Sequence, residues 1–348
     1  MPYCKHSGRR SDAEIHACTP PRVAIVERMT QYAYDPDFLP HLSQIPTVGD
    51  YSTAAKIQAM RAMRAEGVPI PAPNPAVRRE DRTIPAQGSQ AAVAVRIYTP
   101  KAAASAPRPC VYEIHGGGFM FGTLDMMDPW CDAIAASIDA VVVSVDYRLA
   151  PEHPFPAGID DCYAGLRWTA ENAKSLGIDP KRIAIAGQSA GGGLAAGLAL
   201  MARDKSGPAI CYQLLEIPEI DDRLDTPSMM AFQDTPFWNR PNAVWSWKHY
   251  LGPNHKGAPS LYAAPARAQA KDLKGLPPAY VSTMEFDPLR DEGIRYAMGM
   301  LEAGVSVELH NYAGTFHGSA FVPSAEPSRR NAAEIVTILR KRLHPQAA

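Results

Sequence analysis

Short apolar segments alternate with longer segments of helical periodicity along most of the chain. In 91–99, valine and isoleucine occupy every second position, which is the period of a half-buried strand. In 53–67, apolar residues recur at helical spacing until Gly67. Applied to the whole chain, these patterns predict strands at 77–84, 91–99, 111–115, 140–145, 182–187, 211–217, 279–284 and 305–310, and helices at 53–67, 128–137, 163–177, 194–202, 289–304 and 332–343.

This alternation predicts an α/β fold with a mostly parallel central sheet of about eight strands and helices on both faces. The stretch from Ile183 to Ala202 has no ionisable side chain over 20 residues, which is long enough to cross a membrane. It also contains five glycines together with Gln188 and Ser189, and its two ends have strand and helix patterns. We therefore interpret it as a buried strand, turn and helix, and expect no stable membrane association.

Two interruptions divide the chain into four segments. Three prolines within 71–75 end the first helical pattern, so residues 1–70 are predicted to be separate from the core. Between 223 and 262 the strand–helix alternation stops, and this stretch holds Trp238, Trp245 and Trp247. It is either additional core or a helical cap over a site. We expect 71–222 and 263–348 to form two parts of one core, and 1–70 to contribute to a cap made by 223–262.

Charge and cysteine content narrow the class of protein. The chain has 35 Lys and Arg against 36 Asp and Glu, so electrostatics give no reason to expect a nucleic acid or an anionic lipid as partner. The six cysteines form no C-x-x-C pair and the first residues lack an apolar signal stretch, which predicts a cytoplasmic protein. Cys4-x-His6 and His16-x-Cys18 have the ligand types of a zinc site. Their one-residue spacing is unlike zinc patterns, so we expect no metal and no cofactor.

Two glycine-rich motifs each follow a predicted strand. GQSAG at 187–191 fits G-x-S-x-G, which is a weak signal alone, but it lies between a strand and an apolar helix. That setting presents a serine, here Ser189, on a tight turn at a helix N-terminus, where developing negative charge is favoured. HGGG at 115–118 follows the strand at 111–115. Its glycines allow backbone N–H groups to point into a site, as an oxyanion requires, although a plain glycine turn is the alternative.

A base is expected after the serine in the chain, and three histidines lie beyond residue 287. His317 lies in a glycine-flanked loop after the last predicted strand, where a base can be presented. His310 continues that strand, so we interpret it as a strand-face residue. His344 lies in a polar tail. The position of His317 therefore favours it as the base.

Two acids compete for the place beside the base. Asp287 follows the strand at 279–284, and Pro288 biases its backbone toward an extended conformation that fixes its direction. Glu285 is the main competitor. Asp291 and Glu292 begin the next predicted helix, where capping and the helix macrodipole account for them.

The motifs together resemble those of the bacterial hormone-sensitive-lipase-like carboxylesterases, which have the α/β-hydrolase fold. The resemblance covers roughly residues 70–345. It rests on HGGGF (115–119), DYRLAPEHPFPAGIDD (146–161), GQSAGGG (187–193), DPLRDEG (287–293) and FHG (316–318), in family order. It implies Ser189 as nucleophile, His317 as base and Asp287 as acid, with an oxyanion hole from the backbone N–H groups of Gly117, Gly118 and Ala190. It also implies a structural role for His115.

Two positions depart from the family pattern. Family members more often have GDSAG, and here Gln188 replaces the aspartate, which we expect to change local charge without loss of activity. Glu216 stands where the family usually has an apolar residue. Only a hydrogen bond to the region around Ser189 would account for an acid at that position.

These features predict a metal-independent esterase that acts on short-to-medium acyl esters of small molecules through an acyl-enzyme. A non-catalytic receptor for a small ligand on the same fold is one alternative, because a fold alone does not establish catalysis. An amidase or acyltransferase that uses the same three residues is the other. An apolar edge strand at 305–309 could pair with a second copy, which leaves a homodimer open.

Overall fold

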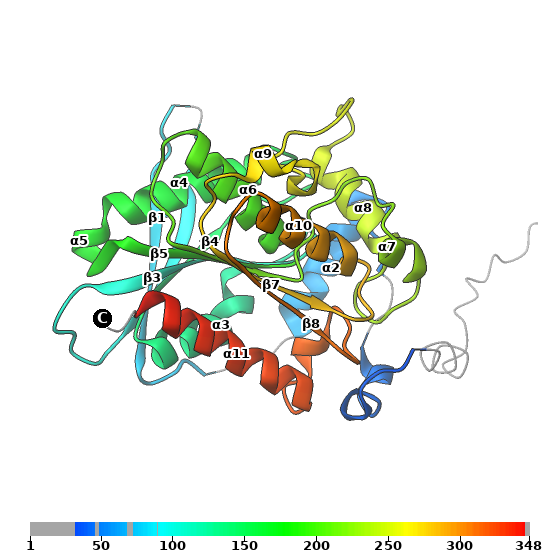
Figure 1. Ribbon diagram of the computed structural model, residues 1–348, viewed down its shortest axis with the longest axis horizontal. Coiled ribbons are helices and arrows are strands. Elements are labelled where there is room, and N and C mark those ends of the chain that lie inside the picture. Colours follow the sequence, from blue (N-terminus) through cyan, green and yellow to red (C-terminus); the bar gives the residue numbers. More distant parts are fainter. Residues whose placement is uncertain (1–31, 46–48, 68–71, 89, 345–348) are drawn as a thin grey trace, which may run out of the picture.

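The computed structural model describes residues 32–45, 49–67, 72–88 and 90–344. They contain one eight-stranded sheet between two layers of helices (Figure 1), so the predicted sheet is confirmed. The strands are β1 (Val77–Ile84), β2 (Val93–Pro100), β3 (Arg108–Ile114), β4 (Val141–Asp146), β5 (Ile178–Gln188), β6 (Tyr212–Glu216), β7 (Ala279–Met284) and β8 (Val307–Tyr312). Their order is β1-β2-β4-β3-β5-β6-β7-β8. The pairs β1–β2 and β2–β4 are antiparallel, and the others are parallel.

The central strands are nearly continuous apolar runs because helices cover both of their faces. Every residue of β6 and β7 is buried, and in β3 only Arg108 is partly exposed. At one edge, β1 is rich in charge and buries only its end residues, Val77 and Ile84. At the other edge, Leu309 of β8 leaves 38% of its surface exposed. The apolar content of each strand therefore follows its place in the sheet.

Helices α4 (Ala157–Glu171), α6 (Ala190–Asp204) and α10 (Arg290–Glu302) cover one face of the sheet, and α3 (Leu124–Ile138) and α11 (Glu326–Leu343) cover the other (Figure 1). Each layer has its own apolar cluster against the sheet. From Ala190 to Ala202, α6 is buried throughout, so the stretch without ionisable residues is a strand end, a turn and an interior helix, as predicted. Among the described residues, no helix has the length and apolar content needed to cross a membrane.

Several boundaries differ from those that periodicity predicts. α3 begins at Leu124 rather than at residue 128, because the Thr123 side chain accepts the N–H of Met126 and caps the helix. The predicted helix at 163–177 is divided into α4 and α5 (Ala173–Leu176), which meet at Asn172. β8 starts at Val307 instead of residue 305. Local hydrogen bonds, which periodicity does not record, set these limits.

Helices α2 (Ala54–Gly67), α7 (Pro227–Ala231) and α8 (Arg240–Leu251) lie together at one end of the sheet (Figure 1). They share an apolar cluster made by Tyr51, Ile57, Met120, Phe121, Met229, Trp238, Ala243 and Leu289. Arg61 of α2 also donates to the carbonyl groups of Met120 and Ala150, at 2.8 and 2.7 Å. Two distant parts of the chain therefore cover the same strand ends. The division of the chain into the four predicted segments stays a prediction.

The remaining short elements are η1 (Pro36–Phe38), η2 (Leu42–Gln44), η3 (Pro265–Arg267), α9 (Ala270–Leu273) and η4 (Ser319–Phe321).

Candidate active site

Ser189 occupies a sharp turn between β5 and α6, with φ 56° and ψ −122°. The turn is so tight that a Cβ atom on Gly187 would lie 2.2 Å from the carbonyl oxygen of Gly191. The Ser189 backbone is held on both sides. Its N–H donates to the carbonyl of Glu216 at 2.9 Å, and its carbonyl accepts from the N–H of Glu219 at 3.0 Å. This arrangement is the strand–turn–helix setting that the sequence predicts.

The structure brings Ser189, His317 and Asp287 together from three separate strand ends. His317 Nε2 lies 2.9 Å from Ser189 Oγ, and His317 Nδ1 lies 2.7 Å from Asp287 Oδ2. The other carboxylate oxygen of Asp287 accepts the N–H of Leu289 at 2.9 Å, which fixes the carboxylate plane. All three side chains are buried. The order serine, imidazole, carboxylate permits one proton to move from the hydroxyl to the ring.

The competing acid and histidines lie elsewhere. Glu285 Oε2 accepts the N–H of Gly314 at 2.6 Å, so its carboxylate supports the loop before His317 and does not contact the imidazole. His310 on β8 pairs with Glu334 at 2.8 Å. His344 Nε2 lies 2.6 Å from the carbonyl oxygen of Ile138.

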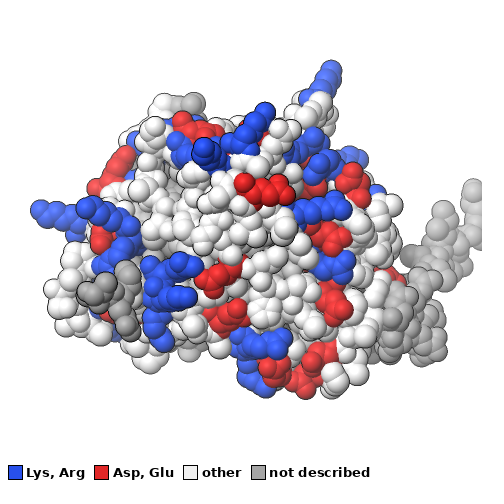
Figure 2. Space-filling model, in the orientation of Figure 1, with Lys and Arg blue, Asp and Glu red and all other residues white. Residues whose placement is uncertain are grey.

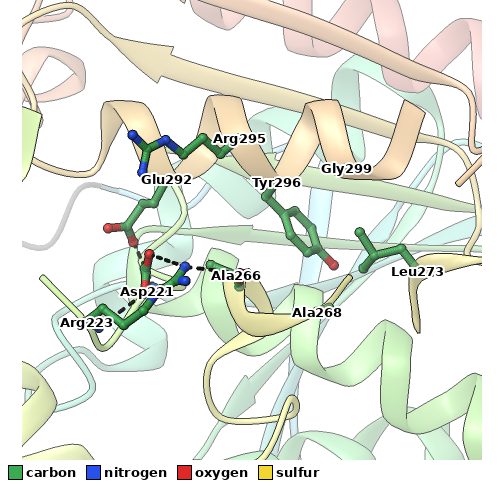
Figure 3. Close-up of a pocket in the computed structure, with 9 residues that line it drawn as sticks. All are labelled: Asp221, Arg223, Ala266, Ala268, Leu273, Glu292, Arg295, Tyr296 and Gly299. Carbon is green, nitrogen blue, oxygen red and sulfur yellow. Dashed lines mark hydrogen bonds and ion pairs between the residues drawn. The ribbon is translucent and has the colours of Figure 1, made fainter. Parts of the chain in front are cut away.

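Asp291 and Glu292 lie in the first turn of α10, as predicted, but their hydrogen bonds join other segments to that helix. Asp291 Oδ2 accepts the N–H of Ser228 in α7 at 2.8 Å. Glu292 Oε1 accepts the N–H groups of Ile220 and Asp221, at 2.7 and 3.1 Å. Figure 3 shows Glu292 pointing toward Asp221 in a small cavity beside α10. That cavity is lined by Asp221, Arg223, Ala266, Ala268, Leu273, Glu292, Arg295, Tyr296 and Gly299, and is separate from Ser189.

The glycine loop after β3 lies against the serine turn. A Cβ atom on Gly116 would lie 2.8 Å from the carbonyl oxygen of Gln188 and 3.4 Å from Ser189 Cβ. Gly117 and Gly118 follow with φ of 125° and 57°, a backbone path that side chains strongly disfavour. The loop therefore brings its backbone beside the Ser189 side chain, and Ala190 begins α6 next to it.

His115 at the start of this loop is a buried ring inside the core. It stacks on Tyr147 with ring centres 4.2 Å apart, and its Nδ1 lies 2.9 Å from the carbonyl oxygen of Gly116. Burial lowers the pKa of His115 to about 4, so the ring is neutral near neutral pH. Its contacts support the glycine loop, which agrees with a structural role.

Aromatic side chains from 223–262 enclose the site. The Trp238 ring centre lies 5.9 Å and the Phe237 ring centre 6.3 Å from the centre of His317. Trp238 also contacts the glycine loop so closely that a Cβ atom on Gly118 would lie 2.5 Å from Trp238 Cη2. Phe237 and Trp238 of this segment therefore lie beside the imidazole and the glycine loop, and the assignment of 223–262 as a cap stays a prediction.

The sequence did not indicate that Glu219, a buried acid, lies close to Ser189. Glu219 is fully buried, and its N–H is one of the groups that hold Ser189. Burial raises the pKa of Glu219 to about 8, with Asp287 nearby adding to the rise and Ser246 opposing it. The only signal in the sequence is a second acid in LLEIPEIDD, shortly after Glu216.

Within the described ranges, no group of three or more His, Cys, Asp and Glu side chains is arranged to hold a metal ion. Cys4, His6, His16 and Cys18 lie outside the described residues. The prediction that they form no metal site stays a prediction.

Comparison with known proteins gives concordant matches. A family model for the alpha/beta hydrolase fold matches residues 111–321. The carboxylesterase NlhH of Mycobacterium tuberculosis is 44% identical over 273 residues, which is 77% of this chain and 83% of that protein. The esterase LipI of the same organism is 41% identical over 298 residues, covering 84% and 91%. A solved bacterial heroin esterase has a TM-score of 0.82 and 46% identity, covering 90% of this chain and 98% of the other.

Proposed function

The chain belongs to the hormone-sensitive-lipase-like carboxylesterases of the α/β-hydrolase fold, and we propose that it hydrolyses small-molecule esters through an acyl-enzyme on Ser189. Its relatives are named esterases, and the chain is an ester-hydrolysing enzyme. The observation that carries the finer proposal is the continuous contact from Ser189 Oγ to His317 Nε2, at 2.9 Å, and from His317 Nδ1 to Asp287 Oδ2, at 2.7 Å.

In the proposed mechanism, His317 Nε2 accepts the hydroxyl proton as Ser189 Oγ attacks the ester carbonyl. Asp287 orients the ring and stabilises the imidazolium that forms. The imidazolium then donates its proton to the departing alcohol, which leaves the acyl group on Ser189. Water, activated by the same imidazole, hydrolyses the acyl-enzyme and restores the free hydroxyl.

The negative charge on the substrate oxygen is proposed to lie among the backbone N–H groups of Gly117, Gly118 and Ala190. The contact between the glycine loop and the serine turn supports this assignment. Ala190 also begins α6, whose dipole is positive at that end. Fixed donors of this kind stabilise an oxyanion because they need no reorganisation during the reaction.

Short-to-medium acyl esters are the proposed substrates. Trp238 lies directly on the glycine loop, and several other bulky cap residues are buried and so reduce the space for a long chain. Phe237 and Trp245 are only partly buried, and Met230 leaves 54% of its surface exposed. The buried ones are Met229, Phe232, Trp238 and Trp247.

The acyl series of nitrophenyl esters from acetate to palmitate tests this preference. Each methylene that still fits adds about 0.8 kcal/mol of burial, so kcat/KM is expected to rise and then fall, with its maximum at roughly four to eight acyl carbons. A rate that continues to climb through palmitate, or a jump in activity at an oil–water interface, would instead identify a lipase.

One further assay distinguishes an esterase from the two alternative functions, which are an amidase or acyltransferase and a non-catalytic receptor. A chromogenic short-chain ester, its amide analogue and an added alcohol acceptor are offered to the same enzyme. Ester hydrolysis should dominate; faster amide cleavage or transfer to the alcohol would identify an amidase or an acyltransferase. Binding without turnover of any of them would identify a receptor.

We also propose a cytoplasmic location and leave a homodimer as an expectation. Cys110, Cys131, Cys162 and Cys211 are free thiols, and three of them are buried, which suits a reducing compartment. The exposed edge strand β8 offers unpaired backbone groups to a second copy.

A further inference from the structure

Gln188 and Glu216 lie opposite each other on the neighbouring strands β5 and β6, directly before the turn that carries Ser189. Gln188 Nε2 donates to Glu216 Oε1 at 3.1 Å. The N–H of Ser189 donates to the carbonyl oxygen of Glu216 at 2.9 Å. Glu216 therefore holds the serine turn at two points, once through its backbone and once through its carboxyl group.

The second oxygen of this carboxyl group faces α11. Asn331 Nδ2 lies 3.5 Å from Glu216 Oε2. Ser328, three residues earlier on the same helix face, donates to the carbonyl oxygen of Ser319 at 2.8 Å. Ser319 belongs to the loop that carries His317, and its Oγ accepts the N–H of Phe316 at 2.8 Å. One face of α11 thus contacts both the support of the serine and the loop of the imidazole.

The carboxyl group of Glu216 is buried, and among the described residues no Lys or Arg pairs with it. Burial raises the pKa of Glu216 to about 7, and the hydrogen bonds from Gln188 and Asn331 oppose that rise. The charge of Glu216 in turn adds to the rise in the pKa of Glu113 on β3 and of Tyr280 on β7, which burial mainly causes. Burying an acid without a cationic partner costs free energy, and the hydrogen bonds from the two amide side chains offset part of that cost.

We propose that Glu216 is a positioning residue whose carboxyl group, held by the amides of Gln188 and Asn331, fixes the Ser189 turn relative to α11 and the His317 loop. The inference rests on the proposed esterase function of Ser189. It also accounts for the two departures from the family pattern together, because Gln188 and Glu216 contact each other. An acid and an amide can bond across the strand pair in either order, whereas two acids repel each other.

The test is a double-mutant cycle on this pair. Gln188→Glu places a second acid, on a half-buried position, against the buried Glu216, and kcat is expected to fall by about tenfold with little change in KM. Glu216→Gln leaves an amide pair that can still form one hydrogen bond, so its effect should be smaller. In the double variant the amide at 216 can donate to the acid at 188 and accept from Asn331. Its kcat is expected to return to within about threefold of the wild type.

Activity is measured with nitrophenyl butyrate and divided by the concentration of folded enzyme, from circular dichroism and from titration with an organophosphonate. Gln213→Glu is the matched control. It places an acid on a fully buried position of β6, the strand of Glu216, where the amide now donates to the carbonyl of Pro277 at 2.8 Å. It should lower the melting temperature and leave kcat per folded enzyme unchanged. Asn331→Leu removes the contact between Glu216 and α11 without adding charge. This variant tests the positioning role if Gln188→Glu does not fold.

Recovery in the double variant, together with a lower kcat for Asn331→Leu, supports the positioning role. Strictly additive effects on kcat, or changes in melting temperature alone, would overturn it. Ser189→Ala is assayed in parallel. If that variant loses turnover while the cycle is additive, only the role of Glu216 fails; if it retains turnover, the proposed function itself fails.

Discussion

Ser189 adopts a backbone conformation that residues with side chains rarely adopt, and such strain costs about 1–3 kcal/mol. The turn persists because its neighbours determine it. Gly187 and Gly191 approach too closely for side chains, and the carbonyl of Ser189 accepts the N–H groups of Gly193 and Glu219 at 3.0 Å each. The strain is therefore maintained where it directs Oγ toward His317.

At the same scale, Asp287→Asn should lower kcat by about four orders of magnitude, because His317, the proposed base, loses the anion that contacts its Nδ1. Glu285→Gln removes a carboxylate of similar position in the sequence, but that group supports Gly314 and not the imidazole. Its effect on kcat should be small. The two purified variants are compared with one nitrophenyl ester, and the reverse ranking would assign the acid to Glu285.

The sequence was sufficient to select Ser189 and His317 as candidates, because each lies in a distinctive motif. It left Asp287 and Glu285 in competition, since both follow the same strand. In the structure the Asp287 carboxylate contacts His317, 30 residues away, whereas the Glu285 carboxylate contacts Gly314, 29 residues away. Periodicity carries no information on such distant pairs. It also could not show that Glu216 bonds to Gln188, which accounts for the acid that the family pattern left unexplained.

The eight strands and the long helices against the sheet were predicted near their observed places, because periodicity records which face is buried, whereas no range was predicted for α7 or α8. Their ends were predicted less well. The start of α3 depends on the Thr123 cap, and α11 begins at Glu326, with Pro327 in its first turn, rather than at residue 332. Local hydrogen bonds and backbone preferences at polar positions set these helix ends, and the pattern of apolar residues does not indicate them.

The contact between α6 and β3 gives a prediction at the scale of these elements. A Cβ atom on Gly191 would lie 2.0 Å from the carbonyl oxygen of Ile114 and 2.5 Å from that of His115. Gly191→Ala must therefore move α6 away from β3. It should lower the free energy of unfolding by about 1–3 kcal/mol, and kcat with it, since α6 begins beside Ser189, the proposed nucleophile.

Gly299→Ala in α10 is the control for that substitution. Its Cβ atom would meet only the Leu273 side chain, at 3.2 Å, and alanine favours a helix by up to about 1 kcal/mol. Its stability should be equal to or above that of the wild type. Urea unfolding of both variants decides the matter, and a Gly191→Ala protein as stable as the wild type would contradict the close approach.

The whole molecule shows two features that no single segment encodes. The strand order places β3 between β4 and β5, which brings the glycine loop beside the serine turn. An apolar cluster joins α2 to α7 and α8, which lie far from α2 in the chain. Sequence patterns predicted that both regions depart from the core, but their shared apolar cluster depends on tertiary packing.

Positive and negative side chains are interspersed on the face shown in Figure 2, in keeping with the near-neutral net charge.

Buried acids should make the stability of the molecule depend on pH. Burial raises the pKa of Glu113 from 4.5 to about 8, opposed by a hydrogen bond from Ser144. Its proton therefore stabilises the folded state fully below pH 4.5, and this contribution is lost as pH rises toward 8. Glu113→Gln should make the fall of stability across this range shallower, by up to about 1.4 kcal/mol per pH unit, the slope for one proton.

Chemical unfolding at several pH values measures that slope. Glu302→Gln, at an exposed acid at the end of α10, is the matched control and should leave the slope unchanged. Equal slopes for the wild type and Glu113→Gln would show that Glu113 does not hold a proton in the folded state.

The central claim is that Ser189 is the nucleophile of an acyl-enzyme, and the turnover of nitrophenyl butyrate by folded Ser189→Ala tests it most directly. Without the hydroxyl, neither His317 nor the backbone donors can form the covalent intermediate, so turnover should fall by a factor on the order of 10⁶. Circular dichroism establishes that the variant is folded. A folded Ser189→Ala protein that retains more than a few per cent of the wild-type rate would contradict the account.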